Sequence, residues 1–297
     1  MKETKNTCIL CGYAGKSDKI ASKLRDSTSH SVVRCIRCGH VQISPIPSPE
    51  EEKKFYDLNK QPKNVGIKIS IDSLKGRQRY DIIRRANFVS GRTKPGSSIL
   101  DVGSSYGFFL DEMRNRGYKA NGIEISKERL EISKKVTRAK VFKINLLENS
   151  VNIGKYDVIT ISHILEHVSL PIKLCYILKY YLKSGGCVIA EVPNLDDPML
   201  LASKGYKSFW WQRAHISYFS QNTLLRVFRE AGYKNIKITG VQRYGIDNMM
   251  NWLCRGKPQV DSPNFETKGQ YKWLEKYYKS YLERRKTCDT LIVIANL

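Results

Sequence analysis

The chain has 297 residues, 41% of them hydrophobic, and a formal net charge of +23. This length suffices for one large domain with a small module, and the apolar content suffices for a packed core. The opening residues MKETKNTCILCG lack the apolar segment of a signal peptide, and no apolar run is long enough to span a bilayer. We therefore expect a cytoplasmic protein whose eight cysteines are reduced or bound to metal.

The excess of Lys and Arg has two interpretations. It either provides a solvated, lysine-rich surface or serves a polyanionic partner. Partners of that kind are RNA, an anionic membrane surface met peripherally, and a phosphate-bearing small molecule. The composition leaves these alternatives open.

Two C-x2-C pairs lie near the N-terminus, and a glycine follows each pair. Two such turns direct four thiolates toward one point, as in a tetrahedral zinc site. A four-thiolate site has no open coordination position, so we expect structural Zn2+ and no catalysis there. The other four cysteines are scattered and are expected to be ordinary thiols. The predicted zinc ligands are Cys8, Cys11, Cys35 and Cys38.

Three prolines between residues 45 and 49 predict an extended connector after this module. We place a zinc-ribbon-like module at residues 1–48, a linker with entry helices at 49–90, and the main domain at 91–297. Beyond residue 91, strand and helix patterns alternate, which is typical of a parallel, doubly wound sheet. Strands are predicted at 98–103, 119–126, 139–145, 155–162, 186–194, 233–242 and 289–297, and helices at 106–117, 127–136, 170–186 and 220–232.

The last predicted strand, DTLIVIANL, has no helix before it that would make a regular crossover. We therefore expect it to enter the sheet antiparallel, with residues 243–287 as an insertion before it. The predicted fold class is α/β, a seven-stranded Rossmann-like sheet with an N-terminal zinc-ribbon module.

The stretch ILDVGSSYGFFLDEM predicts a strand that turns sharply into a helix. A dinucleotide site would have G-x-G-x-x-G at this turn, and two of those glycines are missing or displaced. The stretch instead resembles the D-x-G-x-G-x-G loop of class I S-adenosylmethionine-dependent methyltransferases, with a serine in place of one glycine. The matching residues are Asp101, Gly103, Ser105 and Gly107.

The resemblance continues downstream, where an L-E-H-V segment and a K-x-G-G turn follow in order. It implies that Glu124 accepts hydrogen bonds from the ribose hydroxyls of S-adenosylmethionine, a role shared with dinucleotide folds. It also implies that Asn145 and Leu146 hold the adenine and that Ser162 and His163 lie near the methionine moiety. Glu166 and His167 are expected on the following helix, in capping and packing roles.

The cysteine module and the segment HISYFSQNTLLRVFREAGY resemble a methyltransferase subgroup that includes sugar C-methyltransferases. In those enzymes a Glu-His pair precedes S-Y-F-S, and the histidine is taken as the base. The matching residues here are Ala214 and His215, so the histidine is kept and the glutamate is not. Since a neutral imidazole can accept a proton near neutral pH, His215 is the candidate catalytic base.

Candidate substrate residues surround that histidine and continue into the insertion. Trp211 and Tyr218 are expected to wall a pocket, with the core of a lid as the alternative for Trp211. Arg213 is expected to hold a phosphate or carboxylate. Tyr244, Asn248 and Trp252 are spaced four apart. They are therefore expected on one helix face, which either contacts substrate hydroxyls or packs on the sheet.

Together these features predict an S-adenosylmethionine-dependent methyltransferase acting on a sugar or glycan precursor, either nucleotide- or lipid-linked. One alternative is an RNA methyltransferase that uses the basic surface and the zinc module. Against it, the fourth strand is followed by SHILEH and not by the N/D-P-P-Y motif of exocyclic amine methylation. A second alternative is a non-catalytic zinc-ribbon adaptor.

Overall fold

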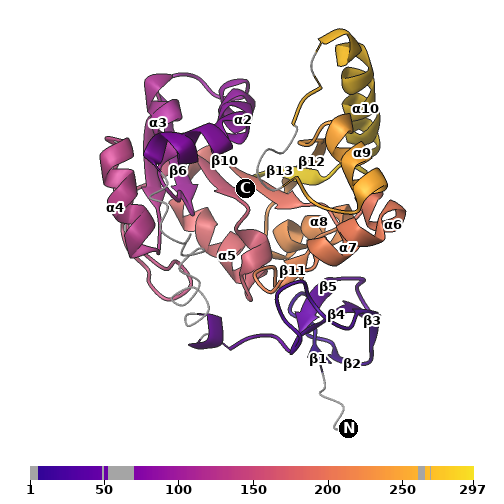
Figure 1. Cartoon of the computed structure of the whole chain (residues 1–297). Helices are drawn as coiled ribbons and strands as arrows, with labels where there is room; N and C mark the ends of the chain where they lie inside the picture. The colour runs from indigo at the N-terminus through magenta and orange to yellow at the C-terminus, as the bar shows by residue number, and fades with distance from the viewer. Residues whose placement is uncertain (1–5, 49, 53–69, 260–264, 268) are drawn as a thin grey trace.

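A seven-stranded mixed sheet forms the centre of the computed structural model, which describes residues 6–48, 50–52, 70–259, 265–267 and 269–297 (Figure 1). The strand order is β12-β13-β10-β9-β6-β7-β8. In this sheet β13 runs antiparallel to both its neighbours, as predicted for the last strand. The α/β fold class is thereby confirmed. The strands are β6 (Ser98–Val102), β7 (Lys119–Ile123), β8 (Val141–Phe142), β9 (Tyr156–Ser162), β10 (Leu182–Pro193), β12 (Asn235–Val241) and β13 (Thr290–Asn296).

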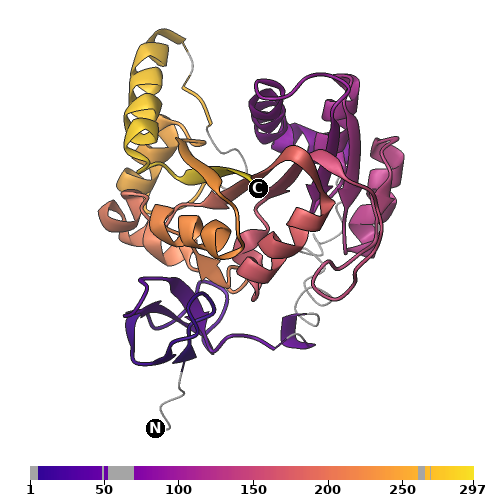
Figure 2. The same cartoon turned by 180° about the vertical axis from the view of Figure 1, so that it is seen from behind.

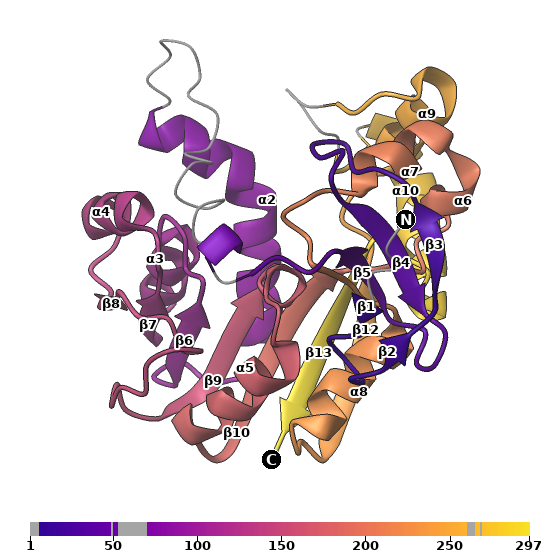
Figure 3. The same cartoon turned by 90° about the horizontal axis from the view of Figure 1, so that it is seen from below.

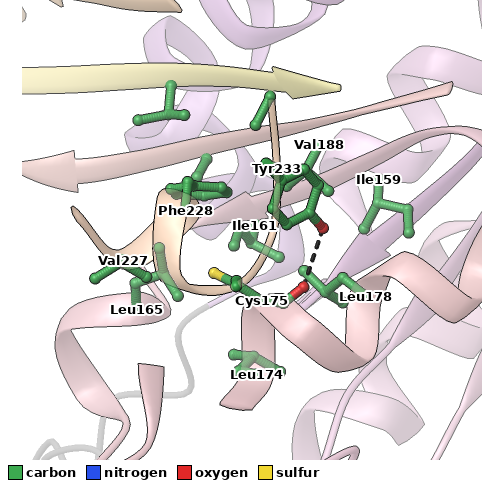
Figure 4. Packing of buried hydrophobic residues seen from close by; sticks show 14 of the residues in the cluster. Ile159, Ile161, Leu165, Leu174, Cys175, Leu178, Val188, Val227, Phe228 and Tyr233 are labelled. Atoms are coloured by element: carbon green, nitrogen blue, oxygen red, sulfur yellow. Dashed lines mark hydrogen bonds between the residues drawn. The ribbon is translucent and has the colours of Figure 1, made fainter. Parts of the chain in front are cut away.

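Helices cover both faces of the sheet, and each face has its own hydrophobic core. One core includes side chains of α5 (Pro171–Leu178) and α8 (Gln221–Glu230), and Figure 4 shows part of it. There the Tyr233 hydroxyl donates a hydrogen bond to the Cys175 carbonyl at 3.0 Å. The other core includes side chains of α2 (Ile71–Ser90) and α3 (Phe108–Asn115). Next to α3 lies α4 (Lys127–Val136).

The N-terminal residues form a small β module that is joined to the main domain through a shared sheet. The order in this sheet is β11-β5-β4-β3, and β11 (Ser217–Tyr218) comes from the main domain. Figure 1 shows the module beside β11, and Figure 3 shows the module from below. The other strands of the module are β1 (Asn6–Thr7), β2 (Ala14–Gly15), β3 (Ser17–Ala21), β4 (Ser31–Cys35) and β5 (Val41–Ser44).

Four helices flank the end of the sheet where β12 and β13 lie (Figures 1 and 2). α6 (Met199–Ala202) and α7 (Lys204–Trp210) follow β10, whereas α9 (Ile246–Arg255) and α10 (Lys272–Arg285) lie between β12 and β13. The short 3-10 helices are η1 (Leu165–His167), η2 (Lys179–Tyr181) and η3 (Gly269–Tyr271). Among the described residues, no helix has both the length and the apolarity needed to cross a membrane.

Two predicted boundaries are wrong, and the structure gives the reasons. The helix predicted at 170–186 ends at Leu178, and β10 begins at Leu182, because Leu182 already pairs with Tyr156 of β9. The register shifts between Leu182 and Cys187, and the intervening Gly185 has φ +74°. The strand predicted at 139–145 is reduced to the two residues of β8, which pair with β7. Of the segment predicted as linker and entry helices, 49–90, residues 49 and 53–69 lie outside the described residues, and α2 occupies Ile71–Ser90.

Candidate functional site

The turn between β6 and α3 requires residues without large side chains. Gly103, Ser105 and Gly107 all have positive φ, at 78°, 52° and 78°. A Cβ atom on Gly103 would lie 2.1 Å from Cδ1 of Ile164, so a larger residue would require the Ile164 side chain to move and would be strained at this positive φ. The turn therefore keeps its backbone open at the carboxyl end of β6, where ligands of open α/β sheets bind.

Glu124, which directly follows β7, fastens this turn. Its Oε2 accepts a hydrogen bond from the Ser105 backbone N–H, and its Oε1 accepts one from the Ser126 N–H, both at 2.8 Å. The side chain is buried. Each carboxylate oxygen has a second lone pair, so Glu124 can still accept hydrogen bonds from two ligand hydroxyls. These residues thus fit a ligand that carries a ribose.

Asp101 lies at the end of β6 below the turn and is also buried. Burial raises the pKa of its carboxyl group to about 6, although the Thr160 hydroxyl donates a 2.7 Å hydrogen bond to Oδ1. The carboxylate thus lies at the carboxyl end of β6, and because burial disfavours its isolated charge, a cationic partner would stabilise it. An ammonium group of a bound ligand would be such a partner.

The other residues predicted to bind S-adenosylmethionine also lie at the carboxyl ends of the strands. Asn145 and Leu146 follow β8, where the Asn145 side chain accepts a hydrogen bond from the Leu147 N–H at 3.2 Å. Ser162 ends β9, and His163 follows it with φ +54°. The topology therefore brings all the residues predicted to bind S-adenosylmethionine to the carboxyl ends of adjacent strands, as their order in the sequence suggests.

His163 lies between two buried carboxylates. Its Nδ1 is 3.0 Å from Oε1 of Glu166, and its Nε2 is 3.1 Å from Oε1 of Glu191. Burial alone would lower the pKa of His163, but these two hydrogen bonds raise it. With both ring nitrogens facing carboxylates, the imidazolium form is favoured. Glu191 also accepts hydrogen bonds from Arg84 and Arg85 of α2, at 2.8 and 2.9 Å.

His215 lies in a cluster with Glu166 and His167, and the ligating atoms of the three side chains are within 4.8 Å of one another. The two imidazole rings meet edge to face, with centroids 5.0 Å apart. Nδ1 of His167 lies 2.8 Å from the Ala214 carbonyl and donates a hydrogen bond to it, because a carbonyl oxygen can only accept. The cluster can accept a proton, and two imidazoles with one carboxylate could also hold a divalent metal ion.

Within this cluster the His215 ring is neutral and the Glu166 carboxylate is charged. Burial and the neighbouring His167 lower the pKa of His215 to about 3, so that its ring is neutral. Burial would raise the pKa of Glu166, but the hydrogen bond from His163 and the nearby histidines lower it to about 2. A neutral imidazole beside a fixed carboxylate is the arrangement in which an imidazolium is stabilised as it forms.

The N-terminal module contacts this cluster through Arg25. Its guanidinium donates to Oε1 of Gln212, and Nε2 of Gln212 lies 2.8 Å from Nε2 of His215. Arg25 also donates to the Phe209 carbonyl at 3.1 Å, and its backbone N–H donates to the Trp211 carbonyl at 2.9 Å. The module therefore helps to set the position of the His215 ring.

Two of the substrate residues predicted around His215 require correction. Trp211 and Tyr218 are only 3% and 1% exposed, and they pack against Leu24 and Ile43 of the module. They form part of the core between module and domain and do not wall a pocket. Arg213 is buried at the same junction, where its backbone N–H donates to Oδ1 of Asp26 at 2.8 Å.

The predicted residues of the insertion do not share one helix face, because α9 begins only at Ile246. Tyr244 precedes the helix and stacks on Phe265, with ring centroids 5.2 Å apart. Even so, Tyr244, Asn248 and Trp252 line one small cavity, together with the buried carboxylates of Asp197 and Asp289. The Asn248 side-chain amide donates a hydrogen bond to Oε1 of Gln259 at 3.3 Å.

The four N-terminal cysteines converge as predicted. Sγ of Cys8 lies 3.6 Å from Sγ of Cys38, and Sγ of Cys11 lies 3.7 Å from that of Cys35. A tetrahedral zinc ion with bonds of about 2.3 Å holds its sulfurs about 3.8 Å apart. The donor set and its spacing therefore fit zinc.

A family model described as a methyltransferase domain matches residues 74–238, which is more than half of the chain. The chain therefore belongs to the methyltransferase domain family.

Two curated relatives are ubiquinone biosynthesis O-methyltransferases. The one from Vibrio parahaemolyticus is 29% identical over 105 residues, which cover 33% of this chain and 45% of the relative. The one from Vibrio cholerae is 26% identical over 153 residues, which cover 49% and 60%. The chain thus spans about half the length of these curated relatives. A solved SAM-dependent methyltransferase from Archaeoglobus fulgidus shares the fold at 16% identity, with a TM-score of 0.51 over 75% of this chain and 98% of that chain.

Proposed function

We propose that the protein is an S-adenosylmethionine-dependent methyltransferase. The observation that carries this proposal is the left-handed turn at Gly103–Gly107, fastened by the buried Glu124 at the carboxyl edge of the sheet. The family match supports an enzyme over a non-catalytic adaptor. The donor residues are those predicted from the sequence, with Asp101 facing the ammonium group and Glu124 the ribose.

The bound donor supplies a methyl group that is already activated on a positively charged sulfur. The protein therefore has to align the acceptor and remove its proton. His215 takes the proton of an acceptor hydroxyl while the new oxygen–carbon bond forms and the sulfur–carbon bond breaks. The Glu166 carboxylate stabilises the resulting imidazolium, and the Ala214 carbonyl fixes the orientation of the neighbouring His167 ring.

The proposed acceptor is a hydroxyl of a sugar or glycan precursor, nucleotide- or lipid-linked. Support comes from the four-cysteine module and the HISYFS segment, which resemble those of sugar methyltransferases. The missing glutamate before His215 favours oxygen over carbon as the methylated atom. The curated relatives carry the name O-methyltransferase. The module binds one structural Zn2+ through its four cysteines.

A calorimetric titration with S-adenosylhomocysteine tests the donor assignment, and a screen with labelled donor tests the acceptor. We expect binding with one site per chain, and label transfer to a nucleotide- or lipid-linked sugar. The screen also contains bulk RNA and phenolic quinone precursors. Absence of S-adenosylhomocysteine binding would overturn the donor assignment. Transfer to RNA or to the phenols alone would overturn the acceptor assignment.

Replacing Glu124 with glutamine is expected to weaken S-adenosylhomocysteine binding about 10- to 100-fold. The reason is that hydrogen bonds to a charged acceptor contribute about 1.5–3 kcal/mol each, and the ribose would lose such an acceptor. Isothermal titration calorimetry measures the effect. Glu128→Gln, on the exposed surface of α4, is the matched control and should bind as the wild type does. Equal affinities of the two variants would remove Glu124 from the donor site.

A further inference from the structure

The outer surface of α10 has an unusual composition. Every exposed residue of this helix is either aromatic or positively charged. The helix lies at the periphery of the molecule, away from the N-terminal module (Figures 1 and 2). We call this surface the α10 face. It consists of Lys272, Trp273, Lys276, Tyr277, Tyr281, Arg284 and Arg285.

The aromatic side chains of the α10 face form a continuous ridge. Trp273, Tyr277 and Tyr281 are spaced four apart and lie on one side of the helix, with 68%, 60% and 43% of their surface exposed. The rings of Tyr277 and Tyr281 stack with centroids 6.2 Å apart, and Arg285 lies over the Tyr281 ring at 5.4 Å. Exposed rings in such a row mark an interaction surface.

The two acidic residues of α10 point away from this ridge. Glu275 is buried and accepts hydrogen bonds from the Ile246 N–H and the Thr267 hydroxyl, at 3.0 and 2.8 Å. Glu283 accepts a hydrogen bond from the Gln242 N–H at 2.9 Å. The exposed face therefore carries positive charge with no exposed acid to offset it, on a chain whose net charge is +23.

We propose that the α10 face docks the protein onto an anionic lipid surface. Trp and Tyr side chains partition into the headgroup region, where one edge is apolar and the other is wet. Interspersed Lys and Arg side chains are attracted to anionic headgroups, and the two effects add. A single-stranded nucleic acid is disfavoured, because its binding sites are grooves, whereas this face lies on the outside of a peripheral helix.

Side chains on the inner side of α10 contact a series of charged residues that leads to Glu191 of β10. Lys279 donates a hydrogen bond to the Arg243 carbonyl at 3.3 Å, and the Arg243 guanidinium pairs with Asp81 of α2. Asp81 in turn pairs with Arg84, which contacts Glu191. These contacts link α10 to Glu191, which lies beside His163. The docking itself requires neither donor nor acceptor and is tested independently of methyl transfer.

Sedimentation of the full chain with vesicles tests the proposal. We expect binding to vesicles of 60% phosphatidylcholine and 40% phosphatidylglycerol, weak binding to pure phosphatidylcholine, and loss of binding as salt rises. The triple variant Trp273→Ala/Tyr277→Ala/Tyr281→Ala should lower the partition coefficient about tenfold or more. A matched control replaces the exposed Tyr176 and Tyr180 with alanine and should bind as the wild type does.

Three outcomes would overturn the proposal. One is equal binding of the wild type to neutral and anionic vesicles. Another is a triple variant that binds as well as the control at unchanged thermal stability. The last is binding of a single-stranded RNA oligonucleotide that depends on the three aromatic residues in the absence of any vesicle binding. Circular dichroism of both variants shows whether the fold is kept.

Discussion

Replacing His215 with alanine is expected to lower kcat by about 100- to 10,000-fold, the range that general bases contribute. The affinity for S-adenosylhomocysteine should stay within about twofold, because neither Glu124 nor the Gly103–Gly107 turn contacts this side chain among the hydrogen bonds of the described residues. Steady-state kinetics with the identified acceptor, together with calorimetry, separates the two effects. Full turnover by the variant would remove His215 from the chemistry.

Three controls sharpen this result. His30→Ala changes a histidine of the module that lies outside the cluster and should leave kcat unchanged. Gln212→Ala should lower kcat less than His215→Ala does, because it removes a group that only positions the ring. If the cluster instead holds a metal ion, added Mn2+ should stimulate the wild type and fail to stimulate Glu166→Ala. Insensitivity of the wild type to added Mn2+ would favour the proton-acceptor role.

The pH profile offers a second readout of the same assignment. Since burial lowers the pKa of His215 to about 3, its neutral form is present throughout the range in which the protein is expected to be folded. His215 is therefore not expected to add an acid limb to kcat near pH 6.5, where an exposed histidine would titrate. The pH dependence of kcat is measured at saturating S-adenosylmethionine, because protonation of Asp101, whose carboxyl pKa is about 6, would affect donor binding.

The convergence of the candidate S-adenosylmethionine-binding residues was predictable because its signals are local. A strand, a turn with small residues and a carboxylate at the end of the next strand follow in order, and the sheet brings them together. The same holds for the cysteine pairs, whose spacing alone indicates convergence. The antiparallel final strand was predictable from its apolar run and from the lack of a crossover helix before it.

The acceptor side could not be predicted in the same way, because its members come from distant parts of the chain. Glu166 and His167 were expected to cap a helix and to pack against the core. In the structure they lie beside His215, near the contact between the main domain and the N-terminal module. The buried Glu191 gave no signal in a strand that otherwise looked apolar. Trp211 and Tyr218 have the composition of a pocket wall, and only the packed module shows that they are core.

The N-terminal module is integrated with the main domain, because its strand β5 pairs with β11, which begins two residues after His215. Ser217 pairs with Gln42, and the Ile43 N–H donates to the Ile216 carbonyl at 3.0 Å. Nε2 of His40 lies 3.2 Å from the Ser217 hydroxyl. The segment that carries the candidate base therefore takes its conformation from the module.

Removal of zinc is accordingly expected to abolish turnover while sparing the donor site. Structural zinc contributes on the order of 10 kcal/mol to the folding of small metal-bound domains, so the module should unfold without it. The double variant Cys8→Ser/Cys35→Ser should contain less than about one tenth of the zinc of the wild type. Its kcat should fall by about 100-fold or more, as for His215→Ala, because β11 and Gln212 lose their partners.

The measurements are zinc content by mass spectrometry, kcat, and calorimetry with S-adenosylhomocysteine. The donor affinity should remain within a few fold, since Asp101 and Glu124 lie in the central sheet and contact no module residue through a hydrogen bond among the described residues. The exposed Cys254 provides the matched control, and Cys254→Ser should keep both zinc and activity. A zinc-free variant with full turnover would show that His215 is positioned without the module. A wild-type chain that purifies without zinc would show that the four thiols hold no structural metal.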